Sequence, residues 1–160
     1  MAILMCPGGR SGTHMTEQNS ANSEENLVLG SQLSDITRVR GWIEQLARRH
    51  AIPENTQFAM NLCLEEALSN CVRHGYAGES GHAMTVRFTM PSEVQFVLTV
   101  EDEAPHFDPL TVPYQSPLKP DGDILVGGQG LRLIREFADK VEYKPRPIGN
   151  RLTMVFSISG

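Results

Sequence analysis

The sequence predicts an α+β fold, a two-layer sandwich in which a mostly antiparallel sheet of about five strands carries three main helices on one face. Apolar patterns occur in the order strand, two helices, two strands, a long irregular segment, a helix and two strands. The paired strands are joined by short turns, which favours antiparallel pairing. With 160 residues, 40% of them hydrophobic, the chain has the size of one domain and enough apolar side chains for one core.

The N-terminal third of the chain changes from a polar leader to an amphipathic pattern. Residues 1–25 are rich in Gly, Ser, Thr, Asn, Gln and Glu and predict a flexible leader, part of which could be a cloning remnant. The globular domain is then expected over residues 26–160, beginning with a β-prone stretch at 26–30. Apolar residues next recur at helical spacing and predict one amphipathic helix from Ser34: Ile36, Val39, Ile43, Leu46 and Ala47.

A second helix and a hairpin are predicted in the middle of the chain. Pro53 suits the first turn of a helix and Gly75 suits the position after its end, which together predict a helix over residues 53–74. Alternating apolar and polar residues at 84–90 and 94–100 predict two strands joined by a turn.

The C-terminal third begins with a long irregular segment. Residues 102–130 are rich in Pro, Gly and Asp without periodicity, and a loop of this length is usually functional or mobile. A helix at 130–138 and a second hairpin with strands at 141–144 and 151–158 complete the pattern.

Composition and charge argue against several classes of function. The formal charge of −5 gives no basic face for a nucleic acid. No apolar run approaches the roughly 18 residues that span a bilayer, and the first residues lack the features of a signal peptide, so a cytoplasmic location without a membrane partner is expected. The three cysteines show no CxxC spacing, which argues against a zinc site and a disulfide framework, and Cys63 and Cys71 are interpreted as small buried hydrophobes.

A polar line on the predicted second helix is the first candidate for chemistry. Glu66, Asn70 and His74 are spaced four residues apart and therefore lie along one side of a helix. A carboxylate and an amide on one face can activate a hydroxyl group and hold a hard cation through oxygen. The alternative is a solvated helix face, and for His74 a cap or packing role at the helix end.

Two further features flank the long loop. Asp102 ends a strongly apolar strand, where a carboxylate can reach the edge of a heterocycle. The segment Gly127-Gly-Gln-Gly130 opens a helix, and backbone N–H groups at a helix start can bind phosphate when glycines permit close approach. The alternative for the glycines is an ordinary hinge.

In this order the three segments resemble the three ATP boxes of the GHKL fold, and most of all its anti-sigma factor serine/threonine-protein kinase branch. They read Leu64-Glu-Glu-Ala-Leu-Ser-Asn-Cys-Val-Arg-His-Gly-Tyr76, Val100-Glu-Asp-Glu-Ala-Pro-His-Phe-Asp-Pro109 and Gly127-Gly-Gln-Gly-Leu-Arg-Leu-Ile134. The resemblance covers residues 26–158 and implies the Bergerat ATP-binding sandwich, a histidine-kinase-like ATPase domain with a long ATP lid.

The resemblance also implies roles for individual residues. Asn70 would hold Mg²⁺, Asp102 would accept a hydrogen bond from the adenine amino group, and Glu66 would be the general base. Gly128 and Gly130 would face the phosphates of ATP. The predicted ATP-binding set also contains His74, Ala104, Gly127, Leu131 and Thr153.

The second box departs from the Asp-x-Gly-x-Gly pattern of the wider fold. Ala104 and His106 occupy the two glycine positions. Ala104 places a methyl group where close approach to the nucleotide, or a left-handed backbone, would need glycine. The methyl group would cost little if the backbone there is extended.

Two functions follow from the resemblance. In the first, the protein uses Mg²⁺ and ATP to phosphorylate a serine of a small anti-sigma-factor antagonist and thereby switches between that protein and a sigma factor. In the second, the same fold is a module that binds a sigma factor or another regulator with weak or no nucleotide binding. The ATP domain of a histidine kinase is a third possibility, which residues 1–25 do not favour because they offer no dimerising helix with a phospho-acceptor His. A homodimer is expected in either of the first two cases.

Overall fold

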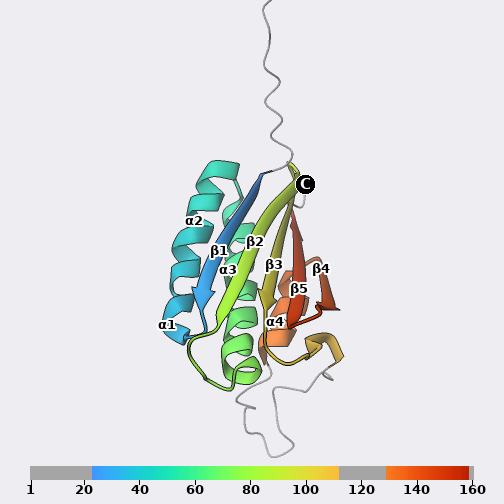
Figure 1. The fold of residues 1–160 in the computed structure, drawn as a ribbon. Helices are drawn as coiled ribbons and strands as arrows, with labels where there is room; N and C mark the ends of the chain where they lie inside the picture. Colours follow the sequence, from blue (N-terminus) through green and yellow to red (C-terminus); the bar gives the residue numbers. More distant parts are fainter. Residues whose placement is uncertain (1–22, 112–128, 159–160) are drawn as a thin grey trace, which may run out of the picture.

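Five strands form one antiparallel sheet in the order β1-β2-β3-β5-β4 (Figure 1). The computed structural model describes residues 23–111 and 129–158. The strands are β1 (Glu24–Gly30), β2 (Ala83–Ser92), β3 (Gln95–Asp102), β4 (Lys140–Pro145) and β5 (Asn150–Ser157). The helices are α1 (Leu33–Ile36), α2 (Arg38–His50), α3 (Glu54–Asn70), a π-helical turn (Cys71–Gly75), a 3₁₀ turn (Pro109–Thr111) and α4 (Gln129–Phe137).

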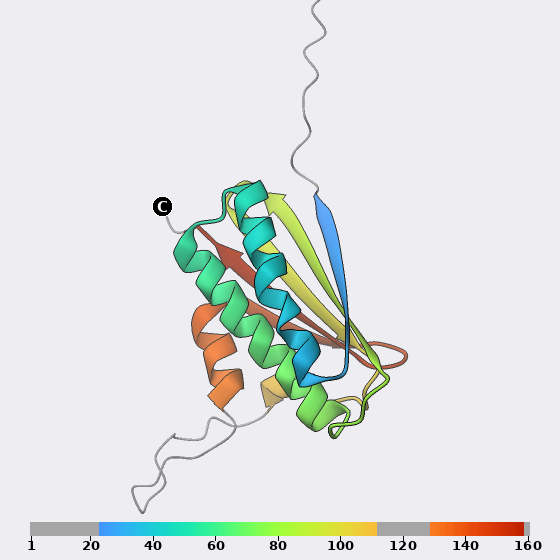
Figure 2. The same ribbon diagram turned by 90° about the vertical axis from the view of Figure 1, so that its left-hand side faces the viewer.

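All helices lie on one face of the sheet, so the predicted two-layer α+β sandwich is confirmed (Figure 2). The strict alternation of β3 explains the layering, because side chains of successive strand residues point to opposite faces. Phe96, Leu98 and Val100 are buried beneath the helices, and the residues between them are only half-buried on the open face. The core therefore lies between the sheet and the layer formed by α2, α3 and α4.

Two element boundaries differ from the predictions. β1 begins at Glu24 rather than residue 26, so the last residues of the predicted leader belong to the sheet, where Glu25 also pairs with Arg49 of α2. The single helix predicted from Ser34 is divided at Thr37, whose hydroxyl group donates to the Ser34 carbonyl oxygen. Such local side-chain bonding competes with helix continuation, and the apolar periodicity alone does not reveal it.

The helix predicted over residues 53–74 is confirmed, but its last turn is wider than an α-helix. α3 ends at Asn70, and the following π-helical turn carries Val72 into the core and leaves His74 exposed. π-helical turns are often found at functional sites. This turn leads to the end of the sheet at which β3 finishes.

The predicted long loop is described only at its start. Residues 103–111 leave β3 and end in the 3₁₀ turn beside α4. The predicted leader up to residue 22 and the loop from residue 112 to residue 128 lie outside the described residues.

Candidate functional site

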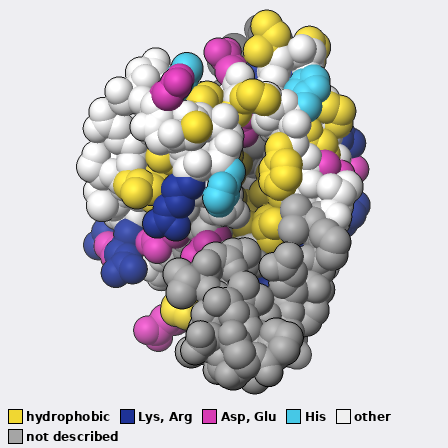
Figure 3. Space-filling model, turned by 90° about the horizontal axis from the view of Figure 1, so that it is seen from below, with side chains coloured by type: hydrophobic (Ala, Val, Ile, Leu, Met, Phe, Trp, Pro, Cys, Tyr) yellow, Lys and Arg dark blue, Asp and Glu magenta, His cyan; other side chains and the backbone are white. Residues whose placement is uncertain are grey.

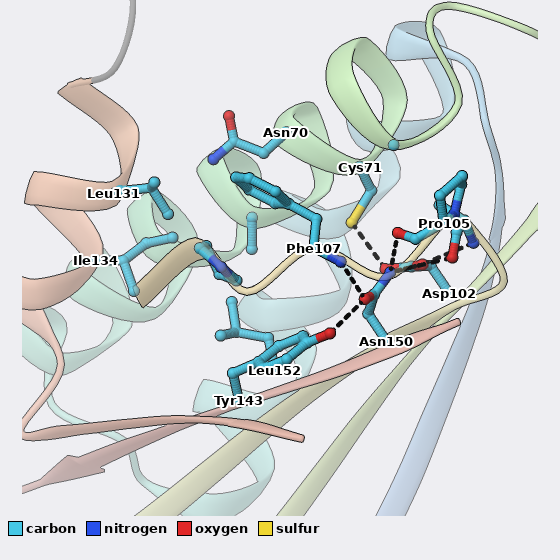
Figure 4. A pocket seen from close by; sticks show the side chains of 14 residues that line it. Asn70, Cys71, Asp102, Pro105, Phe107, Leu131, Ile134, Tyr143, Asn150 and Leu152 are labelled. Carbon is cyan, nitrogen blue, oxygen red and sulfur yellow. Dashed lines mark hydrogen bonds between the residues drawn. The ribbon is translucent and has the colours of Figure 1, made fainter. Parts of the chain in front are cut away.

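A pocket opens at the end of the sheet where β3 finishes and β5 begins, beneath α3 and the first turns of α4. Seen from this end, hydrophobic side chains gather in the middle of the surface (Figure 3). The cavity volume of the pocket is about 60 Å³, and the space counted together with the open solvent at its mouth is about 490 Å³. Its apolar lining includes Ala67, Phe107, Leu131, Ile134 and Leu152, and its polar lining includes Asn70, Cys71, Asp102, Tyr143 and Asn150 (Figure 4). An apolar slot with a few polar groups suits a planar base.

Asp102 is the buried carboxylate of this pocket, with only 5% of its surface exposed. Its Oδ1 atom accepts hydrogen bonds from the backbone N–H of Ala104 at 2.9 Å and from Asn150 Nδ2 at 2.8 Å. Its Oδ2 atom accepts from the Cys71 thiol at 3.3 Å. None of the ion pairs found among the described residues includes Asp102. The carboxylate is therefore held by neutral donors and keeps acceptor capacity at Oδ2.

Cys71 is a polar partner as well as a packing residue. It was predicted as a small buried hydrophobe, but it is half-buried, lines the pocket and points its sulfur toward Asp102 (Figure 4). Burial and the charge of Asp102 raise the pKa of the Cys71 thiol far above its ordinary value. The thiol therefore stays protonated and acts as a weak donor.

The backbone at Ala104 does not need the glycine that the family pattern has at this position. Among the described residues other than glycine, positive φ angles occur at Ala51 and Ala77 and not at Ala104. Ala104 is 3% exposed, and a Cβ atom added to Gly75 would lie 2.9 Å from the Ala104 methyl group. The Ala104 methyl group therefore packs against Gly75, in space that is free because residue 75 has no side chain.

Glu66 lies against the first turn of α4. A Cβ atom added to Gly130 would overlap the Oε2 atom of Glu66 and lie 3.1 Å from its Cδ atom. The glycine at position 130 thus leaves room for this carboxylate. The adjacent Glu65 points away toward α2, where its Oε1 atom lies 3.7 Å from Arg40. The two consecutive carboxylates therefore have different surroundings, because successive residues of an α-helix point about 100° apart.

The structure brings together half of the predicted residues that it describes: Asn70, Asp102, Ala104 and Leu131 line the pocket. Glu66 and Gly130 are not among the lining residues but lie against each other where α3 meets α4. Gly127 and Gly128 lie outside the described residues.

Two predicted residues do not join this group. His74 is exposed and is not among the residues that line the pocket. Thr153 lies on the open face of the sheet, where its hydroxyl group is 3.5 Å from that of Thr99. The period of two along β5 places Thr153 and the pocket residue Leu152 on opposite faces, so Thr153 does not face the base pocket.

Sequence reasoning missed Asn150, which is directly opposite Asp102 in the register of β3 and β5. Its amide bonds to Asp102, and the Tyr143 hydroxyl group donates to its Oδ1 atom at 2.8 Å. The only signal in the sequence was its position after Gly149, immediately before the strand predicted at 151–158. Pairing that strand with the one ending at Asp102 would have indicated the contact.

Comparison with protein families gives a match over residues 29–156 to the histidine kinase-like ATPase domain. The chain belongs to this family. A curated relative of this ATPase domain is the serine/threonine-protein kinase BtrW of Bordetella bronchiseptica, which is 30% identical over 136 residues, covering 84% of this chain and 94% of BtrW. The similarity to this protein kinase covers most of the present chain and almost all of BtrW.

Two solved structures share the fold of this ATPase domain. One contains the RsbU and RsbW domains of a Mycobacterium tuberculosis protein, with a TM-score of 0.57 and 14% identity over 84% of this chain. This chain corresponds to 32% of that structure. The other is the histidine kinase domain of a blue-light activated histidine kinase from Erythrobacter litoralis, with a TM-score of 0.50 and 17% identity, covering 78% of this chain and 60% of that one.

The described part of the chain has no helix that is both long and apolar enough to cross a membrane.

Proposed function

We propose that this chain is a serine/threonine-protein kinase that binds ATP with Mg²⁺ in the pocket and phosphorylates a serine of a small anti-sigma-factor antagonist. The observation that carries the proposal is that Asp102 and Asn70 line one pocket. Glu66 lies one helical turn before Asn70 on α3 and contacts position 130 at the start of α4. Membership of the histidine kinase-like ATPase family and similarity to a serine/threonine-protein kinase support this proposal.

The pocket residues fit an adenine nucleotide. Leu131, Ile134 and Leu152 supply an apolar slot, and Asp102 Oδ2 supplies an acceptor for an amino group. The first turn of α4 borders the pocket through Leu131, and the backbone N–H groups of a helix start can bind phosphate. Glycine at position 130 keeps a side chain out of this turn.

Asn70 would be the protein ligand of Mg²⁺, because an amide oxygen is a hard donor and Mg²⁺ usually keeps phosphate and water oxygens as its other ligands. When bound, Mg²⁺ neutralises charge on the phosphates during phosphoryl transfer. Glu66 would orient the serine hydroxyl group and accept its proton, since its carboxylate lies one helical turn before Asn70. Both side chains are only partly buried, so a partner's hydroxyl group can reach them.

The biological consequence we propose is a partner switch in the cytoplasm. A phosphoserine adds about −1.5 to −2 charges, which can expel the antagonist from an interface and leave the kinase free to hold its sigma factor. The kinase would act as a homodimer, and its catalytic domain would begin with β1 at Glu24.

Two measurements test the proposal. Mg²⁺-ATP at 100 times its dissociation constant should stabilise the protein by about 2.7 kcal/mol, which thermal unfolding detects. γ-Labelled ATP should then label a candidate antagonist from the same cell. Capture of antagonist or sigma factor without stabilisation by ATP and without label would favour the binding module and contradict the kinase.

A further inference from the structure

Asn150 uses every hydrogen-bonding group of its side chain within the protein, and only 8% of the residue is exposed. Its amide nitrogen donates to Asp102 Oδ1 at 2.8 Å, to the Pro105 carbonyl oxygen at 3.1 Å and to the Ala104 carbonyl oxygen at 3.3 Å. Its Oδ1 atom accepts from the Tyr143 hydroxyl group at 2.8 Å and from the Phe107 N–H at 3.0 Å (Figure 4). The side chain therefore joins the end of β3, the start of the long loop and β4.

These partners also determine which way the amide faces. The Phe107 N–H is an obligatory donor, so the atom it meets must be the amide oxygen. The amide nitrogen must then face Asp102, where it donates to the carboxylate. Turning the amide over would place oxygen against carboxylate and a donor against a donor, so a single orientation satisfies the network.

The same stretch of chain is held by neighbouring contacts. The Tyr76 hydroxyl group accepts from the Glu103 N–H at 2.9 Å, and His106 Nε2 lies 2.9 Å from the Arg146 carbonyl oxygen. Gly149, with φ of +84°, lies so close to the Asp102 carbonyl group that a Cβ atom there would overlap it. The glycine that lets two backbone segments approach closely is thus Gly149, immediately before Asn150. It does not lie in the second box, where Ala104 and His106 replace the expected glycines.

We propose that Asn150 is the positioning residue of the base pocket. It occupies Asp102 Oδ1 together with the Ala104 N–H, so that Oδ2 is the acceptor left for a ligand, and it fastens residues 104–107 to the sheet. The partner of Oδ2 among the described residues is the Cys71 thiol, a weak donor that the amino group of a base can replace. The pocket is then selective for a base with an exocyclic amino group. This inference rests on the proposed binding of ATP.

The closing experiment compares ATP with inosine triphosphate, in which an oxygen atom replaces the 6-amino group of adenine. Calorimetry of the full chain should show that the wild-type protein prefers ATP by roughly 10- to 100-fold, the usual worth of a hydrogen bond to a charged group. Asn150→Ala should lower the affinity for ATP and bring the ratio of the two affinities close to one. The affinity for inosine triphosphate should change by less than about 3-fold. A residue with a merely structural role would weaken both nucleotides equally.

Asn150→Asp keeps the size of the side chain and provides a second variant if Asn150→Ala fails to fold. It places two carboxylates side by side, so one of them is expected to take up a proton as the pH falls. The preference for ATP should be lost at pH 8 and partly restored at pH 5. Hydrogen exchange without nucleotide should show faster exchange of the Ala104 and Phe107 amides in both variants.

The two proposals fail differently. If the wild-type protein binds ATP but Asn150→Ala keeps the full preference for ATP over inosine triphosphate, the role of Asn150 is wrong and the kinase proposal stands. Unchanged exchange at Ala104 and Phe107 would also overturn it. If the wild-type protein binds neither nucleotide, the proposed function and this inference are both wrong.

Discussion

Two carboxylates at the end of β3 lie one residue apart and face opposite sides of the sheet. On the open face, Glu101 lies 2.6 Å from Arg151 Nε and 4.0 Å from Arg146. On the helix-covered face, Asp102 is bonded to the neutral groups of Ala104, Asn150 and Cys71. Both carboxylates are largely buried, yet one is neutralised by cations and the other keeps an oxygen for a further donor. The polar groups on the open face pair with one another across neighbouring strands, and those on the covered face line the pocket.

The same contrast occurs on α3. Glu65 is directed toward Arg40, and Glu66 is directed toward Gly130. In each case one carboxylate has no ion-pair partner among the described residues, and its sequence neighbour has one. Variants of these neighbours form matched pairs that test whether the two sides differ in function.

The largest difference is expected for the pair on α3. Glu66→Gln should slow phosphoryl transfer by roughly 10²- to 10⁴-fold, the usual worth of a general base, because an amide cannot take the serine proton. Binding of ATP and of the partner protein should be unchanged. Glu65→Gln should transfer at nearly the wild-type rate, since it loses only an exposed ion pair. Single-turnover transfer of labelled phosphate measures both, and equal rates for the two variants would contradict the role of Glu66.

The next difference is expected for the pair on β3. Asp102→Asn should weaken ATP by roughly 10- to 100-fold, because it replaces a charged acceptor that a base amino group would use. Glu101→Gln should leave ATP affinity unchanged and lower stability by less than about 1 kcal/mol, since its partners Arg146 and Arg151 are partly exposed to solvent. Calorimetry gives the affinities, and chemical unfolding gives the stabilities. The comparison breaks if Glu101→Gln affects ATP as strongly as Asp102→Asn does.

The sequence was sufficient to predict the strands, the long helix and part of the pocket lining, namely Asn70, Asp102, Ala104 and Leu131. Alternation in residues 84–100 and helical spacing in residues 53–74 are properties of single segments, and the structure confirms both. Glu66, Asn70 and Asp102 were also predictable, because four-residue spacing and the end of an apolar strand locate them on their own elements.

The rest of the site depends on pairing between segments far apart in the sequence. Asn150 meets Asp102 through the register of β3 and β5, and Gly75 meets Ala104 through the packing of the π-helical turn. Neither contact has a periodic signal in its own segment. Thr153 is the opposite case, a residue that was predicted for the site and lies on the open face of the sheet. Which residues of β5 face the helices depends on the alternation along that strand, and a resemblance between motifs does not determine it.

A smaller effect is expected from a pair of alanines near the pocket. Ala104→Gly should lower stability by about 1–2 kcal/mol, because it removes a buried methyl group and adds backbone freedom. ATP affinity should be unchanged, since the Ala104 backbone needs no left-handed conformation. Ala77→Gly is the control, because Ala77 is exposed with φ of 51° and glycine relieves that strain. It should be neutral or stabilising by up to about 1 kcal/mol, as chemical unfolding would show.

The smallest effect is expected for Thr153→Val. The resemblance implies that Thr153 contacts adenine, whereas the structure places it on the open face of the sheet, and this variant tests which is right. The hydroxyl group of Thr153 is at the limit of a hydrogen bond with Thr99, and valine is equally suited to a strand. Stability should therefore change by less than about 0.5 kcal/mol, and ATP affinity should not change. Leu152→Ala, one residue earlier and on the pocket side, should weaken ATP several-fold by removing part of the apolar slot. If Thr153→Val lowers the affinity for ATP more than Leu152→Ala does, the adenine contact lies on the opposite face of β5. The helix-covered face would then not be the binding face.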